Sequence, residues 1–164
     1  MLTVNDRVPT SIILRDERNQ PVHLGQLSGQ MFLLYFYPKD NTAVCTLEAQ
    51  QFRDHQASLK RYGVSVIGVS KDSVESHQKF KQDHRLNFAL WSDSDRQLQE
   101  AFGVWQEKRM MGKSYMGTVR SSFLINSKGV IVKSWLRVKP KDHIQEIIQT
   151  LEELKQKRSA FQSD

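Results

Sequence analysis

The chain has very little cysteine. Cys45 is the only one among 164 residues, so no disulfide bond can form within one chain. A single thiol excludes the disulfide-rich class of small secreted proteins and suits a reducing compartment. Long apolar runs are missing too: the longest extends from Met31 to Tyr37, against the roughly 20 residues that a membrane-spanning helix needs. The N-terminus carries charge early and lacks the apolar core of a signal peptide. We therefore expect a cytoplasmic protein that does not span a membrane.

Internal repeats, low-complexity tracts and linkers rich in proline or serine are also absent. We expect one domain over residues 1–158 and a frayed tail over 159–164. The 24 basic residues outnumber the 18 acidic ones and give a net charge of +6, which raises the question of a nucleic-acid partner. Acidic residues are interleaved with basic ones, however, and no zinc-finger, RNA-recognition or helix-turn-helix signature stands out. A solvated basic surface is therefore favoured over a nucleic-acid interface.

The spacing of apolar residues predicts an α/β fold, with a central mixed β-sheet flanked by helices and an N-terminal β-hairpin. The run at 31–37 is apolar on both faces, which is typical of a central strand covered on both sides. The expected elements are a hairpin at 11–24, strands at 31–37, 64–70 and 88–91, helices at 45–62, 73–85 and 95–102, a strand, tight turn and strand over 122–136, and a last helix from Asp142.

Cys45 follows the central strand and a short loop, and a stretch of helix formers comes after it. The order predicts a thiol in the first turn of a helix, at the carboxyl end of a strand, where such sheets tend to place chemistry. The positive end of the helix dipole favours the thiolate, which is the nucleophilic form. A lone cysteine is nevertheless more often inert core filler. Two neighbours favour the reactive interpretation: the hydroxyl of Thr42 can bond to a thiolate or a substrate, and Pro38 provides a rigid wall.

The pattern Pro38-x-x-x-Thr42-x-x-Cys45 resembles the active-site signature of peroxiredoxins, the thiol peroxidases built on a thioredoxin-like fold. The surrounding segment 36–48 is similar to that of the bacterioferritin-comigratory, or peroxiredoxin Q, branch. The similarity continues in order along nearly the whole chain, through segments 52–54, 68–72, 76–80, 102–105 and 120–125.

The resemblance implies a role for each matched residue. Cys45 would be the peroxidatic thiol, and Thr42 would hold both the thiolate and the peroxide. Arg120 would lie beside the sulfur, favour the thiolate and stabilise charge as the O–O bond breaks. Pro38 would shield the oxidised sulfur from water. Glu48 would orient an arginine, either Arg120 or Arg53, although the sequence alone is equally consistent with a surface carboxylate.

No bound cofactor or metal is expected. The sequence has no nucleotide-binding fingerprint, and its five histidines lack the spacing of metal ligands. The substrate would be a hydroperoxide. The basic segment Lys108–Lys113 is expected to be a loop that either lines the approach to Cys45 and attracts an anion or is simply solvated.

The sequence departs from the branch at two places. Many members have a resolving cysteine where this chain has Gln50, and the loop has Ala43-Val44 where Pro-Gly is common. A sulfenic acid at Cys45 would therefore need a thiol from outside: glutathione, a thioredoxin or glutaredoxin, or Cys45 of a second copy. This is a one-cysteine mechanism, and the branch similarity favours a monomer or a weak homodimer.

Two other classes of function remain open at this point. A redox sensor or chaperone-like binding protein on the same fold would form the sulfenic acid but turn over little. A cysteine hydrolase would need a histidine base beside Cys45, and His55 falls on a different face of the helix. The combination of Thr42 and Arg120 favours peroxide chemistry over acyl transfer.

The missing resolving cysteine predicts that excess peroxide inactivates the protein when thiol is scarce. A sulfenic acid that persists meets a second peroxide and becomes a sulfinic acid, a generally irreversible step. Peroxidase activity after prolonged exposure to excess hydrogen peroxide should therefore be largely lost without thiol and kept when thiol is present. Full activity after exposure without any thiol would contradict this prediction.

Overall fold

The computed structural model describes residues 1–162, and side chains as far as Arg158. Its elements in chain order are β1 (Leu14–Asp16), β2 (Pro21–Val22), the 3-10 helix η1 (Leu24–Leu27), β3 (Met31–Phe36), α1 (Ala43–Asp54), α2 (Gln56–Arg61), β4 (Val64–Ser70), α3 (Val74–Asp83), β5 (Ala89–Ser92), α4 (Gln97–Phe102), β6 (Trp105–Met110), β7 (Lys113–Thr118), β8 (Ser121–Ile125), β9 (Ile131–Leu136) and α5 (Pro140–Gln162).

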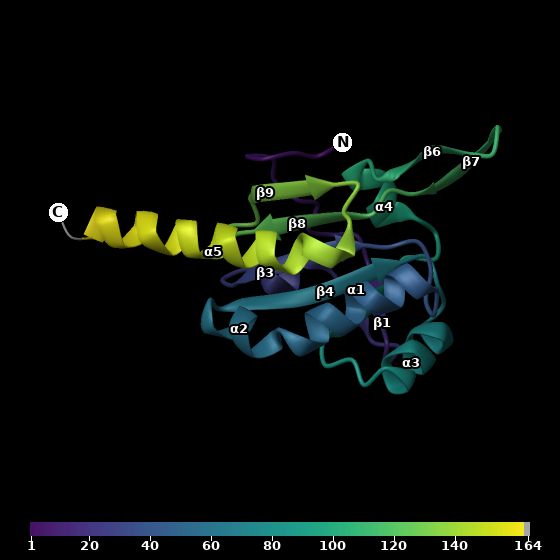
Figure 1. Cartoon of the computed structure of the whole chain (residues 1–164), viewed down its shortest axis with the longest axis horizontal. Coiled ribbons are helices and arrows are strands. Elements are labelled where there is room, and N and C mark those ends of the chain that lie inside the picture. Colours follow the sequence, from purple (N-terminus) through teal and green to yellow (C-terminus); the bar gives the residue numbers. More distant parts are fainter. Residues whose placement is uncertain (163–164) are drawn as a thin grey trace.

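The main sheet has seven strands in the order β2-β1-β5-β4-β3-β8-β9 (Figure 1). β3 pairs parallel to β4 on one side and antiparallel to β8 on the other, and β4 pairs parallel to β5. The outer pairs β1–β2, β1–β5 and β8–β9 are antiparallel. The predicted mixed sheet and N-terminal hairpin are therefore confirmed.

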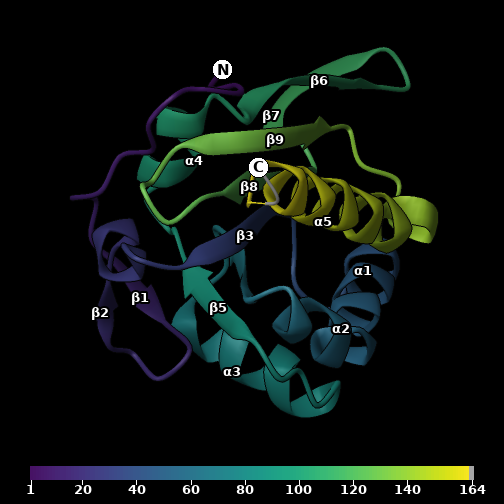
Figure 2. The same cartoon turned by 90° about the vertical axis from the view of Figure 1, so that its left-hand side faces the viewer.

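Both faces of β3 are buried, as its apolar run predicts. Leu33 and Tyr35 face a core that α1, α2, α3 and α5 help to form, whereas Leu34 and Phe36 face a second core shared with α4 and the N-terminal segment. The period-2 alternation of strand side chains accounts for this division. Figure 2 shows α1, α2 and α5 on one side of the sheet and α4 on the other. The strand that leads to Cys45 is thus fixed from both sides.

The helix expected at 45–62 is in fact two helices, so this prediction was wrong in one respect. α1 ends at Asp54, and α2 begins at Gln56. His55 between them has φ −110° and ψ 14°, outside the helical range, and its Nδ1 lies 2.8 Å from the carbonyl oxygen of Gln51. The side chain of Gln56 donates to the carbonyl of Phe52 at 3.1 Å. These two side-chain bonds occupy carbonyls at the end of α1 and so stabilise a break that apolar periodicity does not reveal.

The basic segment expected to be a loop is a β-hairpin. β6 and β7 pair antiparallel and turn at Met111 and Gly112, both with positive φ. The hairpin projects from one end of the main sheet (Figure 1). Charged and polar residues occupy both of its faces, so the sequence there lacks the alternation that identifies a half-buried strand.

Several other boundaries differ by a few residues. α4 starts at Gln97 because Arg96 has φ 60°, a left-handed conformation. The predicted strand–turn–strand is present, with the side chain of Asn126 accepting hydrogen bonds from two backbone N–H groups of the turn. α5 begins at Pro140, and its backbone continues over 159–162. Residues 163–164 of the predicted tail lie outside the described residues, and the extent of the domain stays a prediction. No helix in the described part is long and apolar enough to cross a membrane.

A buried histidine predicts how stability depends on pH. His143 of α5 is 2% exposed and lies 2.7 Å from the hydroxyl of Ser122. Burial lowers the pKa of His143 to about 4. The unfolded chain binds this proton near pH 6.5 and the folded chain does not, so stability falls as pH decreases from there toward 4.

We expect the free energy of unfolding to fall by about 2 kcal/mol between pH 7 and pH 5 in the wild type, relative to His143→Gln. Urea unfolding of both proteins at the two pH values measures this difference. The variant is needed as a reference because other groups titrate in the same range. A difference between the two proteins that does not change with pH would refute the prediction.

Candidate active site

Cys45 lies in the first turn of α1, as predicted. The chain leaves β3 at Phe36, passes through the loop 37–42, and enters the helix with Thr42 as the N-cap. Thr42 has the extended backbone of an N-cap, and its carbonyl accepts the bond from the N–H of Thr46 at 2.9 Å. The cysteine is 2% exposed and belongs to the core cluster on this face of the sheet. A sulfur this buried admits a small oxidant far more readily than a bulky thiol.

Arg120 lies against the sulfur although 75 positions separate it from Cys45 in the chain. The register of β3 and β8 explains the contact. Phe36 pairs with Ser121, so Arg120 stands one residue beyond the last pair, beside the loop that follows β3. Its Nη2 donates to Cys45 Sγ at 3.2 Å, and its Nη1 donates to Glu48 Oε1 at 2.7 Å. The guanidinium therefore joins the thiol to the carboxylate.

Glu48 is three residues after Cys45, so the two side chains share one face of α1. The structure decides between the two arginines that the sequence left open, because Arg53 bonds to Asp54 and to the carbonyl of His84 instead. The Glu48 side chain is 2% exposed. Burial raises the pKa of Glu48 to about 7, although the charge and hydrogen bond of Arg120 act in the opposite direction.

Arg120 keeps its positive charge in this setting. Burial acts against the charged form, but Glu48 and Cys45 together raise the pKa of the guanidinium above its ordinary value. A fixed cation that donates to the sulfur can also stabilise an oxyanion that forms beside it.

Thr42 is near the site, but its hydroxyl has another partner. Its Oγ1 donates to the carbonyl of Lys39 at 2.8 Å, and none of the hydrogen bonds among the described residues joins it to Cys45. Since the proton is engaged, the lone pairs of the hydroxyl oxygen are available to accept a bond from a peroxide O–H. The predicted bond from Thr42 to the thiolate stays a prediction. Pro38 is half-buried at the start of the same loop.

The basic segment contributes one residue to the surroundings of the sulfur. Lys108 of β6 is half-buried, and its pKa is lowered by burial and by Arg120 while Cys45 raises it. Lys113 is exposed at the end of the hairpin, where it pairs with Met110. The approach role of this segment stays a prediction, and among these two lysines Lys108 is the one whose pKa responds to the charge of Cys45.

Sequence reasoning missed the polar network beneath the loop. Asp40 lies in this loop and contacts His77 of α3, both with almost no exposure. Apolar periodicity gives no signal for such a pair. The one available signal was that the segments 36–48 and 76–80, which contain Asp40 and His77, both resemble the peroxiredoxin Q branch. The described residues include no group of three or more His, Cys, Asp or Glu side chains that could hold a metal ion.

Cys45 lies in the first turn of a helix, after the carboxyl end of a central strand, and Arg120 donates to its sulfur. These features are those of a thiol peroxidase with a thioredoxin-like fold. Comparisons with known proteins agree. Residues 4–134 match the AhpC/TSA family. Peroxiredoxin Bcp of Bacillus subtilis is 46% identical over 144 residues, which are 88% of this chain and 92% of that protein. Peroxiredoxin Bcp of Escherichia coli K12 is 42% identical over 140 residues, 85% of this chain and 90% of that one.

Solved structures show the same fold. Peroxiredoxin Q of Xanthomonas campestris superposes with a TM-score of 0.85 at 34% identity, over 91% of this chain and 96% of that chain. A cysteine-to-serine mutant of PrxQ from Xylella fastidiosa gives a TM-score of 0.88 at 34% identity, over 93% of this chain and 96% of that chain. The chain belongs to the AhpC/TSA family and is a peroxiredoxin similar to the Bcp and peroxiredoxin Q proteins. Its single cysteine matches the predicted one-cysteine variant.

The position of Arg120 predicts its effect on the oxidation of Cys45. Replacing Arg120 with alanine removes a donor from the place where charge develops, so the second-order rate constant with hydrogen peroxide should fall by about 100-fold or more. Arg120→Lys keeps the charge but loses the two-pronged contact, and should fall between the wild type and the alanine variant.

Stopped-flow measurement of sulfenic acid formation tests this prediction. Arg109→Ala is the matched control, because Arg109 is exposed on β6 and should leave the rate constant unchanged. Equal rate constants for Arg120→Ala and the wild type would refute the role of Arg120.

Proposed function

We propose that this protein reduces hydrogen peroxide and organic hydroperoxides through a sulfenic acid at Cys45, which an external thiol then reduces. The observation that carries the proposal is the guanidinium of Arg120, which contacts both Cys45 Sγ and Glu48 Oε1. The contact supports the proposal because a cation beside the sulfur also lies beside any peroxide oxygen that reacts there.

The chemistry follows from the site. The thiolate of Cys45 attacks one peroxide oxygen, the O–O bond breaks, and the other oxygen leaves as hydroxide or alkoxide and takes up a proton. The sulfur is oxidised to a sulfenic acid and the peroxide is reduced to water or an alcohol. Arg120 stabilises the charge that develops on the oxygens, and Glu48 holds the guanidinium in place. The Thr42 oxygen accepts a hydrogen bond from the peroxide, and half-buried Pro38 limits access of water to the oxidised sulfur.

Support for organic hydroperoxides comes from a relative. A solved structure of the bacterioferritin comigratory protein of Xanthomonas campestris, 33% identical with a TM-score of 0.83, was described in connection with its alkyl peroxide reduction activity. The rim of the present site also offers apolar surface, since Val44 and Leu47 in the first turns of α1 are exposed.

Regeneration needs a thiol from outside the chain. Cys45 is the only cysteine, so its sulfenic acid meets glutathione, a thioredoxin, a glutaredoxin or Cys45 of a second copy. We infer a cytoplasmic location, where reduced thiols are abundant, and a monomer or weak homodimer. The buried sulfur and the net charge of +6, which makes copies repel, both disfavour a disulfide between two copies.

Intact mass measurement with a sulfenic-acid trap tests the proposal. After one equivalent of hydrogen peroxide, the wild type should gain a single adduct and Cys45→Ser should gain none. Peroxide consumption is then followed with glutathione, with glutaredoxin plus glutathione, and with thioredoxin. A reduced, unlabelled Cys45 would refute the proposal, whereas rapid labelling without turnover with any thiol would favour a redox sensor or chaperone-like protein.

A further inference from the structure

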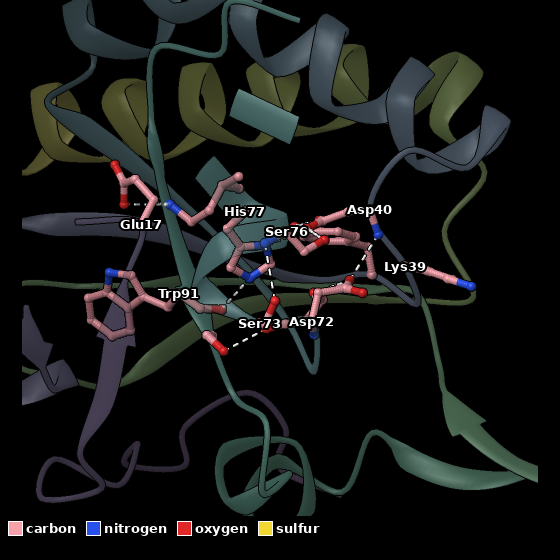
Figure 3. A network of polar contacts seen from close by, with 12 residues as sticks. Glu17, Lys39, Asp40, Asp72, Ser73, Ser76, His77 and Trp91 are labelled. Atoms are coloured by element: carbon pink, nitrogen blue, oxygen red, sulfur yellow. Dashed lines mark hydrogen bonds and ion pairs between the residues drawn. The ribbon is translucent and has the colours of Figure 1, made fainter. Parts of the chain in front are cut away.

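The loop that leads to Cys45 is anchored to the core by one buried carboxylate. Asp40 stands in the middle of this loop, and its side chain is 2% exposed. Its Oδ1 accepts a hydrogen bond from the hydroxyl of Tyr37 at 2.6 Å, and its Oδ2 accepts one from the hydroxyl of Ser76 at 2.8 Å. Nδ1 of His77 lies 2.6 Å from the same Oδ2. Figure 3 shows Ser76 and His77 of α3 converging on Asp40.

The second ring nitrogen of His77 also has a buried partner. Nε2 is 3.1 Å from the carbonyl oxygen of Trp91 in β5, and a carbonyl can only accept. Both ring nitrogens of His77 thus have a buried polar partner, Asp40 on one side and the backbone of β5 on the other. The histidine side chain is completely buried. Each member of the pair satisfies the other in a place that water does not reach, so the loss of either partner is costly.

The same residue is anchored through its backbone. The N–H of Asp40 donates to Oδ2 of Asp72, which also accepts from the hydroxyl of Ser70 at the end of β4. The loop is thus fixed to β4, α3 and β5 at one point. Its neighbours Lys39 and Asn41 are exposed, so Asp40 and Tyr37, which bond to each other, are the two buried residues of the loop.

The anchor determines the geometry at the sulfur. Thr42, the N-cap of α1, is two residues after Asp40, and the hydroxyl of Thr42 is tied to the carbonyl of Lys39 next to Asp40. Arg120 is held by a different element, because it directly precedes β8. Because the two halves of the site are held by different elements, a shift of the loop separates Cys45 from Arg120.

We propose that Asp40 and His77 form a positioning pair that sets the balance between two states of the loop. The closed loop holds Cys45 against Arg120 for reaction with peroxide. An opened loop exposes Cys45, which is 2% exposed when closed, to the bulky thiol that must regenerate it. The role of the opened loop in regeneration by a thiol rests on the proposed function. The control of Cys45 exposure by the pair does not.

The test measures two rates in His77→Leu, which keeps a buried apolar side chain but removes both polar contacts. The rate constant of Cys45 oxidation by hydrogen peroxide should fall by about 10- to 100-fold, since small misplacements of reacting groups have effects of this size. The rate of labelling of reduced Cys45 by a bulky aromatic disulfide should instead rise by about tenfold, because local opening becomes more frequent. Loss of stability alone does not predict slower oxidation together with faster labelling.

Three further variants make the result decisive. His77→Asn places an amide donor near Asp40 and should partly restore both rates. Ser76→Ala removes one donor to Asp40 at a smaller structural cost, and should change both rates in the same directions as His77→Leu even if that variant does not fold. Leu151→Ala opens a cavity beside α5 at the Met31 end of β3, whereas the loop follows the Phe36 end, and should change stability but neither rate.

Two rates that change in the same direction, or that match the wild type, in both His77→Leu and Ser76→Ala would overturn the inference. A wild type that hydrogen peroxide does not oxidise would instead refute the proposed function. The labelling rates would in that case still show whether the pair controls exposure of Cys45.

Discussion

The structure of the site depends on one interaction, the two-pronged contact of Arg120 with Cys45 and Glu48. One guanidinium contacts a buried thiol and a buried carboxylate at once, and so offsets part of the cost of burying both, while Oε2 of Glu48 has no hydrogen-bond partner among the described residues. This arrangement needs the helical spacing of Cys45 and Glu48 and the sheet register that brings Arg120 beside the end of β3. The central strand, the first helix and β8 are therefore all constrained by the same contact.

Burial strengthens this contact but also limits the access of other molecules to the sulfur. Removal of water strengthens the attraction of Arg120 for its two partners, and it raises the pKa of Glu48 to about 7. The same burial hides the sulfur from the large thiol that a protein with one cysteine must recruit. A loop that is rigid enough for the first reaction and able to open for the second resolves the conflict, and the Asp40–His77 pair is placed where it can control that balance.

The hairpin β6–β7 forms a two-stranded sheet separate from the main sheet. It lies outside the main sheet, yet its Lys108 is close enough to be influenced by the charges of Arg120 and Cys45. The site thus draws charged groups from α1, from the residue before β8 and from a separate hairpin.

The sequence by itself determined the order of the strands of the main sheet, the two buried faces of β3 and the place of Cys45 in a first helical turn, because apolar periodicity and helix-start signals act over short distances. The motif resemblance identified the family and named Arg120. Only the tertiary structure decided that Glu48 contacts Arg120 rather than Arg53, that the helix breaks at His55, that Lys108 belongs to a hairpin, and that Asp40 meets His77. These outcomes depend on contacts between segments far apart in the chain or on side-chain bonds to the backbone, for which local patterns of hydrophobicity carry no information.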